Sequence, residues 1–129
     1  NSIGPGRRPS SSIAPTILRR GGRPLLVLGT PGASRIVTAL SWIVVGTVDF
    51  GLGLDAALEA PRVHAQGKTL EVEGGIPEET VKRLAALGHE VKRYPPRDDH
   101  FGGAQAIRVE KGRLVGAADS RRDGVALGY

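Results

Sequence analysis

Hydrophobic residues gather into short runs along the first part of the chain, and glycine, proline or arginine bounds each run. Residues 13–18 and 24–28 have the length and apolar composition of β-strands. The segment Arg19-Arg20-Gly21-Gly22-Arg23 lies between them and supplies the glycines that a hairpin turn favours. The pattern therefore predicts a β-hairpin, preceded at residues 1–12 by an extended or looped segment rich in Gly, Pro, Ser and Arg.

The apolar spacing then changes to that of an α-helix. Ser34 is placed as an N-cap. The apolar positions that follow it at helical spacing are Ile36, Val37, Leu40, Ile43, Val44 and Val48. Because they occupy much of the circumference, the pattern predicts a largely buried helix that ends at Gly51 and Gly53.

Two further helices are predicted. A short one is expected over residues 56–60, with Asp55 as its cap and Pro61 as its stop. The clearest helix signal covers residues 76–91, where Pro77 suits the first turn and Gly88 is placed to end the helix in the left-handed conformation. Glu78 and Glu79 complement the helix dipole. The residues expected to share its apolar face are Val81, Leu84 and Leu87.

The remaining apolar runs predict further strands. Residues 68–73 alternate polar and apolar side chains like a half-buried strand, and 91–94 reads as a short strand before a long polar loop. Residues 104–110 and 114–118 form a second hairpin across Lys111-Gly112. Hairpins with packed helices predict an α+β fold in which antiparallel pairing is prominent, and the 129 residues read as a single unit.

Composition narrows the function classes. The apolar run 40–48 is interrupted by Ser41, Gly46 and Thr47, so it indicates core rather than a membrane span. The absence of cysteine excludes disulfides and thiolate chemistry. The net charge of +5 has a cluster of arginines in the first quarter, which admits a nucleic-acid surface. No aromatic residues interleave these arginines, so solvated arginines or contacts to an acidic partner are favoured and no nucleic-acid partner is predicted.

The stretch GTPGASRI, residues 29–36, joins the second strand to the first helix. It lacks the spacing of a phosphate-binding loop, and no lysine stands where a phosphate would need one. What remains is a turn with exposed backbone amides at Gly32 and Ala33, followed by a helix N-terminus. Such amides suit a negatively charged oxygen, bound or developing in a transition state. An ordinary tight connection is the alternative, and spacing alone favours it.

Other polar clusters have simpler interpretations beside the chemical ones. Ser10-Ser11-Ser12 next to Arg7 and Arg8 could hold a carboxylate, whereas composition favours a flexible linker. The segment Asp98-Asp99-His100 is thin support for a metal, and no metal site is predicted. The charged turn 119–123 is expected to form internal salt bridges. A Ser-His-Asp triad stays open, because its members need only meet in space.

The histidines are His64, His89 and His100. None stands at metal-ligand spacing from another, so structural or solvent-facing roles are expected for them.

Taken together, six segments are similar to the C-terminal part of the small subunit of γ-glutamyltranspeptidases. Their order and spacing match over essentially the whole chain. The segments are RPSSSIAPTI (8–17), GTPGASRIVTAL (29–40), VDFGLGLDAALEAPRVH (48–64), EETVKRLAALGHEV (78–91), GGAQAI (102–107) and GAADSRRDGVALGY (116–129). The serine pair and the Gly-x-Pro-Gly-x-Ser-Arg loop carry the most specific part of this resemblance.

The resemblance implies an N-terminal-nucleophile hydrolase with an αββα sandwich, of which this chain is a part. In that family a proenzyme cleaves itself, and the new N-terminal Thr of the small subunit attacks γ-glutamyl compounds such as glutathione. The γ-glutamyl group then passes to water or to an amino acid or peptide. No metal or organic cofactor is implied.

Carried over by position, Gly32 and Ala33 supply oxyanion-hole amides, and Ser11 and Ser12 hold the α-carboxylate of the substrate. Ala33 stands where Gly is usual, and three neighbours of the serine pair also depart from the family pattern: Ser10, Ile13 and Ala14. These departures leave open a related acylase, such as a cephalosporin acylase, or a polyglutamate-processing enzyme.

The resemblance places the nucleophilic Thr upstream of Asn1 and a carboxylate-binding arginine in the large subunit. The chain begins with Asn1 in place of Met and no basic and apolar signal region follows, so it is interpreted as a processed product or an engineered fragment. From the resemblance it is expected to be inactive alone and able to self-associate or act as a structural module. Its expected partners are the large subunit, the upstream part of the small subunit and a γ-glutamyl substrate. By resemblance the location is periplasmic or secreted.

Overall fold

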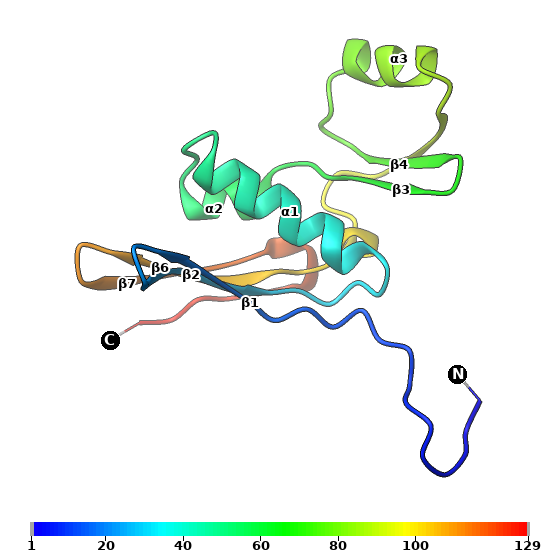
Figure 1. Ribbon diagram of the computed structural model, residues 1–129. Coiled ribbons are helices and arrows are strands. Elements are labelled where there is room, and N and C mark those ends of the chain that lie inside the picture. Colours follow the sequence, from blue (N-terminus) through cyan, green and yellow to red (C-terminus); the bar gives the residue numbers. More distant parts are fainter. Residues whose placement is uncertain (1, 129) are drawn as a thin grey trace.

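The computed structural model describes residues 2–128, which form two β-sheets with helices packed on them (Figure 1). The larger sheet has the strand order β1-β2-β6-β7 and the smaller one β3-β4-β5. The strands are β1 (Thr16–Arg20), β2 (Arg23–Gly29), β3 (Val63–Gln66), β4 (Thr69–Glu73), β5 (Glu90–Tyr94), β6 (Gln105–Glu110) and β7 (Arg113–Ala118). The helices are α1 (Arg35–Val48), α2 (Leu54–Glu59) and α3 (Glu78–Ala86), with short 3₁₀ turns η1 (Asp99–Phe101) and η2 (Ser120–Arg122).

The four-stranded sheet is antiparallel throughout and contains both predicted hairpins. Gly21 and Gly22 have φ values of 56° and 78°, and Lys111 and Gly112 have 48° and 80°. Positive φ at both central residues is the type I′ geometry whose twist matches a tight hairpin. β1 begins at Thr16 instead of residue 13, because Pro15 has no N–H to contribute to a strand ladder.

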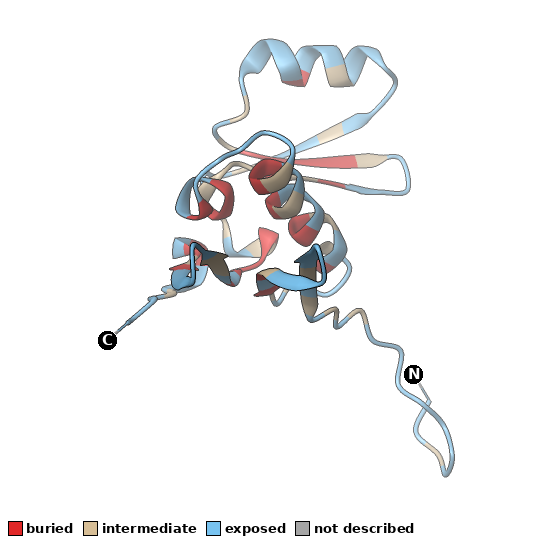
Figure 2. Ribbon diagram, turned by 60° about the vertical axis from the view of Figure 1, so that its left-hand side comes forward, coloured by how far each residue is buried: buried red, intermediate tan, exposed pale blue. Residues whose placement is uncertain are grey.

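One face of this sheet carries the main core. Helices α1 and α2 lie over it (Figure 1), and buried stretches are seen both on these helices and on the sheet (Figure 2). The buried members are Leu26, Leu28, Ile36, Leu40, Ile43, Leu54, Ala57, Leu58, Ala104, Ala106 and Ala117. The opposite face is also apolar but uncovered: Val27 and Ile107 pair across β2 and β6 and are exposed.

The three-stranded sheet has a smaller core beneath α3. Strand β3 pairs antiparallel with β4, and β5 pairs parallel with β4, so α3 is the crossover connection that parallel strands require. Leu70, Val72 and Val81 form this core. The sequence pattern missed β3, and it predicted β4 as half-buried. In fact four of the five β4 residues are buried, because the alternate positions carry Glu71 and Glu73 into polar contacts within the molecule.

The first two helices differ from the sequence prediction in detail. Ser34 does occupy the N-cap position of α1, but its hydroxyl makes no capping bond. α2 begins two residues earlier than predicted, because Leu54 is buried in the core. Asp55 therefore lies in the first turn, where its charge complements the helix dipole, and Gly53 is the N-cap.

Helix α3 is shorter than the pattern predicted. Pro77 is its N-cap residue, and the helix ends at Ala86. Gly88, at φ 94°, ends the helix in the predicted left-handed region. Glu90 already belongs to β5, because parallel pairing with β4 replaces a further helical turn. Leu87 is consequently 77% exposed and does not share the buried face of Val81.

Candidate functional site

The connection between β2 and α1 has an unusual backbone. Gly32 has φ 143° and Ala33 has φ 50°. The Gly32 carbonyl accepts from the Arg35 N–H at 3.0 Å, and the Ala33 carbonyl accepts from the Ile36 N–H at 3.1 Å. Within residues 2–128, the N–H groups of Gly32 and Ala33 donate to no partner. We call residues 29–35 the site loop: its carbonyls are engaged by α1, and two adjacent amides remain available as donors.

A glycine pair packs directly against the site loop. The Thr30 hydroxyl donates to the Pro31 carbonyl at 2.8 Å and accepts from the Gly103 N–H at 3.1 Å. A Cβ on Gly102 would lie 2.6 Å from Thr30 Oγ1 and 2.8 Å from the Pro31 oxygen, and Gly102 also has φ 101°. Only glycine meets both conditions, so the close approach of this segment fixes the site loop from one side.

The serine segment contacts the site loop, although Ser12 and Ala33 are 21 residues apart in the sequence. Ser12 Oγ donates to the Ala33 carbonyl oxygen at 2.7 Å, and Ser11 Oγ accepts from the Ile13 N–H at 3.2 Å. A hydroxyl has one hydrogen to donate, so Ser12 uses its own on Ala33 while Ser11 keeps its own available. Arg7, which the sequence placed beside the serines, donates instead to Ser2.

A polar cluster on the other side of the site loop was not predicted from the sequence. Arg35 Nε donates to the His100 carbonyl oxygen at 2.7 Å, and Arg35 Nη2 lies 3.2 Å from His100 Nδ1. His100 Nε2 lies 2.8 Å from Glu71 Oε2, and the Tyr94 hydroxyl donates to Glu71 Oε1 at 3.1 Å. The Tyr94 and His100 rings stack with centroids 4.3 Å apart. We call Arg35, Glu71, Tyr94 and His100 the loop cluster.

Partners and burial set the protonation of two groups in this region. Burial of Glu71 favours its neutral form, but the hydrogen bonds from His100 and Tyr94 and the positive charge of Arg35 outweigh it, so the pKa of Glu71 is lowered. His64, opposite Glu71 on β3, is 6% exposed. Its Nδ1 lies 2.8 Å from the Thr38 hydroxyl, and its Nε2 is buried without a partner in the described part of the chain. Burial lowers the pKa of His64.

The polar segment 98–100 forms the η1 turn. Asp98 Oδ1 accepts from the His100 N–H at 2.9 Å and so closes the η1 turn. Across residues 2–128, no three His, Cys, Asp or Glu side chains are grouped as metal ligands. His89 lies exposed in the turn before β5.

The charged turn at 119–123 forms the internal salt bridges that were predicted for it. Asp119 Oδ2 accepts from Arg62 Nη2 at 2.7 Å, and Asp119 Oδ1 accepts from Arg121 Nη1 at 3.0 Å. Arg121 also donates to both oxygens of Glu73 at 2.7 Å. The exposed fraction of each of these four side chains is 2% or less. We call Arg62, Glu73, Asp119 and Arg121 the inner network.

The inner network balances two positive against two negative charges. Burial would raise the pKa of Asp119, but the backbone N–H of Arg121 and the charges of Arg62 and Arg121 outweigh it, and the pKa is lowered. The guanidinium of Arg62 also donates to the carbonyls of Phe101 and Leu58. The network therefore ties the end of α2 and β4 to the segments that flank β6 and β7.

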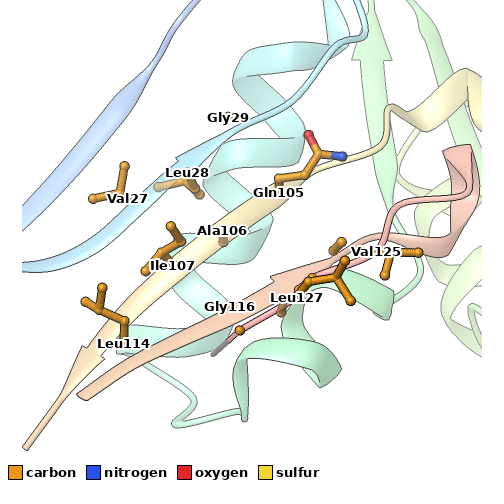
Figure 3. A pocket seen from close by; sticks show the side chains of 14 residues that line it. Val27, Leu28, Gly29, Gln105, Ala106, Ile107, Leu114, Gly116, Val125 and Leu127 are labelled. Carbon is orange, nitrogen blue, oxygen red and sulfur yellow. The ribbon is translucent and has the colours of Figure 1, made fainter.

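The uncovered face of the four-stranded sheet forms a shallow apolar groove of about 630 Å³ (Figure 3). Val27, Ile107 and Leu114 project into it from three strands, and Val125 and Leu127 border it from the C-terminal segment. One end of the groove reaches Gly29, the first residue of the site loop. None of the helices in residues 2–128 combines the length and the apolar character that a membrane crossing requires.

Comparison with known proteins identifies relatives of this architecture. The chain is 41% identical over 133 residues to the glutathione hydrolase proenzyme of Escherichia coli K12, covering all of this chain and 22% of that protein. It is 42% identical over 127 residues to the acylase ACY 1 proenzyme of Pseudomonas sp. SE83, covering 98% of this chain and 22% of that protein. The chain thus spans about a fifth of the length of these relatives.

Solved structures of γ-glutamyltranspeptidases share this fold. The γ-glutamyltranspeptidase of Pseudomonas nitroreducens, solved in complex with L-DON, superposes with a TM-score of 0.87 at 36% identity, over all of this chain and 68% of that one. The architecture is thus part of the α+β fold of N-terminal-nucleophile hydrolases. The family model for γ-glutamyltranspeptidase matches residues 1–129, and the chain belongs to that family.

Proposed function

We propose that the intact protein of which these residues are part cleaves γ-glutamyl compounds such as glutathione and transfers the γ-glutamyl group to water or to an amino acid or peptide. The observation that carries the proposal is the Ser12–Ala33 contact of 2.7 Å. It brings the serine pair to a loop whose two adjacent amides have no partner among the described residues. An acyl group whose carboxylate lay at the serines would have its carbonyl within reach of those amides.

In this proposal the N–H groups of Gly32 and Ala33 receive the oxyanion of the tetrahedral intermediate. They suit the role because the surrounding hydrogen bonds hold them in place before the substrate arrives. A preorganised donor of this kind contributes on the order of 3 kcal/mol to lowering the barrier. The absence of a side chain at Gly32 leaves space for the substrate carbonyl, whereas the Ala33 methyl group narrows the approach.

Ser11 and Ser12 are proposed to orient the α-carboxylate of the γ-glutamyl group. Ser11 has a hydrogen to donate, while Ser12 must rotate away from the Ala33 oxygen before its hydroxyl can donate to a substrate. We therefore expect Ser11→Ala to raise KM by about tenfold and to leave kcat within about threefold, because only binding of the carboxylate is weakened. Steady-state kinetics of the full-length protein measures this. A fall in kcat at unchanged KM would contradict the binding role.

The proposed nucleophile lies outside these 129 residues. By resemblance it is the N-terminal Thr of the small subunit, whose hydroxyl gives up its proton to the α-amine and adds to the γ-carbonyl. Collapse of the intermediate expels the amine, which takes up a proton, and water or an acceptor amine then attacks the acyl-enzyme. We expect the 129-residue chain alone to be inactive, and turnover by the purified chain would contradict this.

The remaining partners are proposed on the same basis. The groove on the uncovered sheet face is proposed to contact other parts of the proenzyme, because its strands are apolar on both faces. The isolated chain is therefore expected to self-associate through this face. Light scattering that gives a concentration-independent monomer would contradict that expectation. The proposed location, periplasmic or secreted, rests on the resemblance.

A related acylase is the second candidate, because a relative of equal similarity is an acylase proenzyme. The Ala33 side chain and the altered neighbours of the serine pair leave room for this candidate, whereas the retained serine pair argues for a γ-glutamyl substrate. The test compares glutathione, an acyl-β-lactam and poly-γ-glutamate as substrates of the self-cleaved full-length protein. Preference for glutathione supports the proposal, whereas preference for either of the others would replace the substrate.

A further inference from the structure

The loop cluster joins the site loop to the three-stranded sheet. Arg35 is the last residue of the site loop and the first of α1, His100 lies in η1, and Glu71 lies in β4. Three elements distant in sequence therefore meet through one guanidinium, one imidazole and one carboxylate. None of these groups has a part in the chemistry proposed above.

The hydrogen bonds determine how His100 carries its proton. A guanidinium only donates, so His100 Nδ1 must accept from Arg35 Nη2. An ionised carboxylate only accepts, so His100 Nε2 must donate to Glu71 Oε2. The arrangement defines a neutral imidazole with its hydrogen on Nε2, and each ring nitrogen has a different partner.

The position of Arg35 connects this cluster to the free Ala33 amide, because the Gly32 carbonyl and the Ala33 N–H belong to one planar peptide. The Arg35 N–H donates to the Gly32 carbonyl, and the next amide, of Ile36, donates to the Ala33 carbonyl. The Arg35 side chain is anchored at its other end by the His100 carbonyl and ring nitrogen. The planar guanidinium of Arg35 makes both contacts, and it therefore fixes the orientation of Arg35, whose backbone N–H holds the Gly32 carbonyl.

We infer that Arg35 and His100 are positioning residues: they clamp the first turn of α1 and so orient the Gly32–Ala33 peptide, which carries the Ala33 N–H, and His100 Nδ1 is the acceptor that this clamp requires. This inference rests on the proposed function for its kinetic consequence, but its structural consequence does not. Glu71 holds the imidazole in the required tautomer, and its own contact with Arg35 is a longer ion pair of 3.9 Å.

Two substitutions separate the ring nitrogens of His100. His100→Asn places an oxygen near the position of Nδ1 and can accept from Arg35, but it does not reach Glu71. His100→Gln places an amide N–H near the position of Nε2 and can donate to Glu71, but it offers no acceptor at Nδ1. Both variants retain the His100 backbone carbonyl that Arg35 Nε contacts. Arg35→Lys keeps the charge and loses the fork.

Hydrogen–deuterium exchange of the full-length protein, followed over a peptide that contains residues 33–37, measures the clamp without reference to activity. We expect exchange to be about tenfold faster in Arg35→Lys, about threefold faster in His100→Gln and within about twofold of wild type in His100→Asn. Equal exchange in the two His100 variants, or unchanged exchange in Arg35→Lys, would overturn the inference.

The same variants tested with γ-glutamyl-p-nitroanilide give the kinetic consequence. A lower kcat with an unchanged KM is expected for Arg35→Lys and His100→Gln, with recovery in His100→Asn. If wild type releases no product while loop exchange responds as expected, the proposed substrate fails and the positioning role stands. If wild type is active and exchange does not respond, the positioning role fails and the proposed function stands.

Discussion

The inner network and the loop cluster are built from the same kinds of side chain but are organised differently. In the inner network both arginines and both carboxylates are buried, and each carboxylate accepts from more than one donor. In the loop cluster the Arg35 and His100 side chains are 21% and 24% exposed. The inner network is buried, and Arg62 Nε is its one side-chain nitrogen without a partner among the described residues. The loop cluster is partly open to solvent through Arg35 and His100, and it adjoins a loop with two unused amides.

The comparison distinguishes two uses of charged side chains in one protein. The inner network stabilises the fold, whereas the loop cluster is proposed to hold the site loop. Removing one member of a closed, buried network leaves another charge without a partner, which is costly. Removing one member of a partly exposed cluster lets water replace the lost partner, which costs less. The substitutions below test this contrast, from the largest expected effect to the smallest.

Asp119→Ala breaks the inner network. It removes the acceptor of two arginines and of the Ala104 and Arg121 amides, so we expect a loss of about 3–5 kcal/mol in the free energy of unfolding. Urea denaturation of the full-length protein measures this loss. Asp123→Asn is the matched control in the same turn, because Asp123 is exposed at φ 51°, a conformation that Asn tolerates. A loss no greater than that of the control would contradict the structural role of the network.

Glu71→Gln weakens the loop cluster. The amide still accepts one hydrogen bond, but the attraction to the Arg35 charge and one of the bonds from His100 and Tyr94 are lost. We expect about 1–2 kcal/mol of destabilisation, less than for Asp119→Ala. Denaturation beside Glu90→Gln, an exposed residue of β5, checks it. If Glu71→Gln costs as much as Asp119→Ala, the contrast between closed and open clusters is wrong.

We expect His64, on β3, to make the free energy of unfolding depend on pH. Its folded-state pKa is lowered by burial from the ordinary value of 6.5. Below that pH the unfolded chain takes up a proton that the folded chain does not, so stability falls as pH falls. His64→Asn, which keeps an acceptor for Thr38, should remove up to about 1.4 kcal/mol of this loss at pH 5.5. Unfolding free energies at pH 7.5 and 5.5 test it, and identical pH slopes in both proteins would contradict it.

The sequence predicted those parts of the fold that depend on local pattern. Both hairpins, the existence of the first helix with its buried Ile36, Leu40 and Ile43, and the glycine that ends α3 followed from turn residues and periodicity. The prediction for that helix was wrong at Val37, which is 59% exposed, and at its end, which is Val48 and not Gly51. β3 was missed and β4 was misread. Strand β3 pairs with β4, β4 also pairs with β5, and Glu71 and Glu73 of β4 are buried; periodicity does not show these contacts. α3 lost its last predicted turn to a parallel strand pair for the same reason.

The candidate site was predictable to the extent that it is made of backbone and short motifs. Gly32, Ala33 and the serine pair were selected from the sequence, and the structure adds that Ser12 contacts Ala33 directly. Arg35, Glu71 and His100 could not be selected, because they come from three elements and have no shared spacing. Arg35 stands in the site-loop motif and His100 in the polar segment 98–100, but no pattern in the sequence joins either residue to Glu71.

The measurement that tests the central claim most directly is release of p-nitroaniline from γ-glutamyl-p-nitroanilide by the full-length protein and two glycine variants. Gly32→Ala forces a side chain onto a φ of 143° and should displace the two peptides that carry the donors, whereas an added Cβ at Gly53, outside the site loop, meets nothing within 4 Å. We expect wild-type turnover, a change of less than about threefold in Gly53→Ala and a fall of about 100-fold or more in kcat for Gly32→Ala. Unimpaired Gly32→Ala, or no turnover by correctly self-cleaved wild type, would contradict the account.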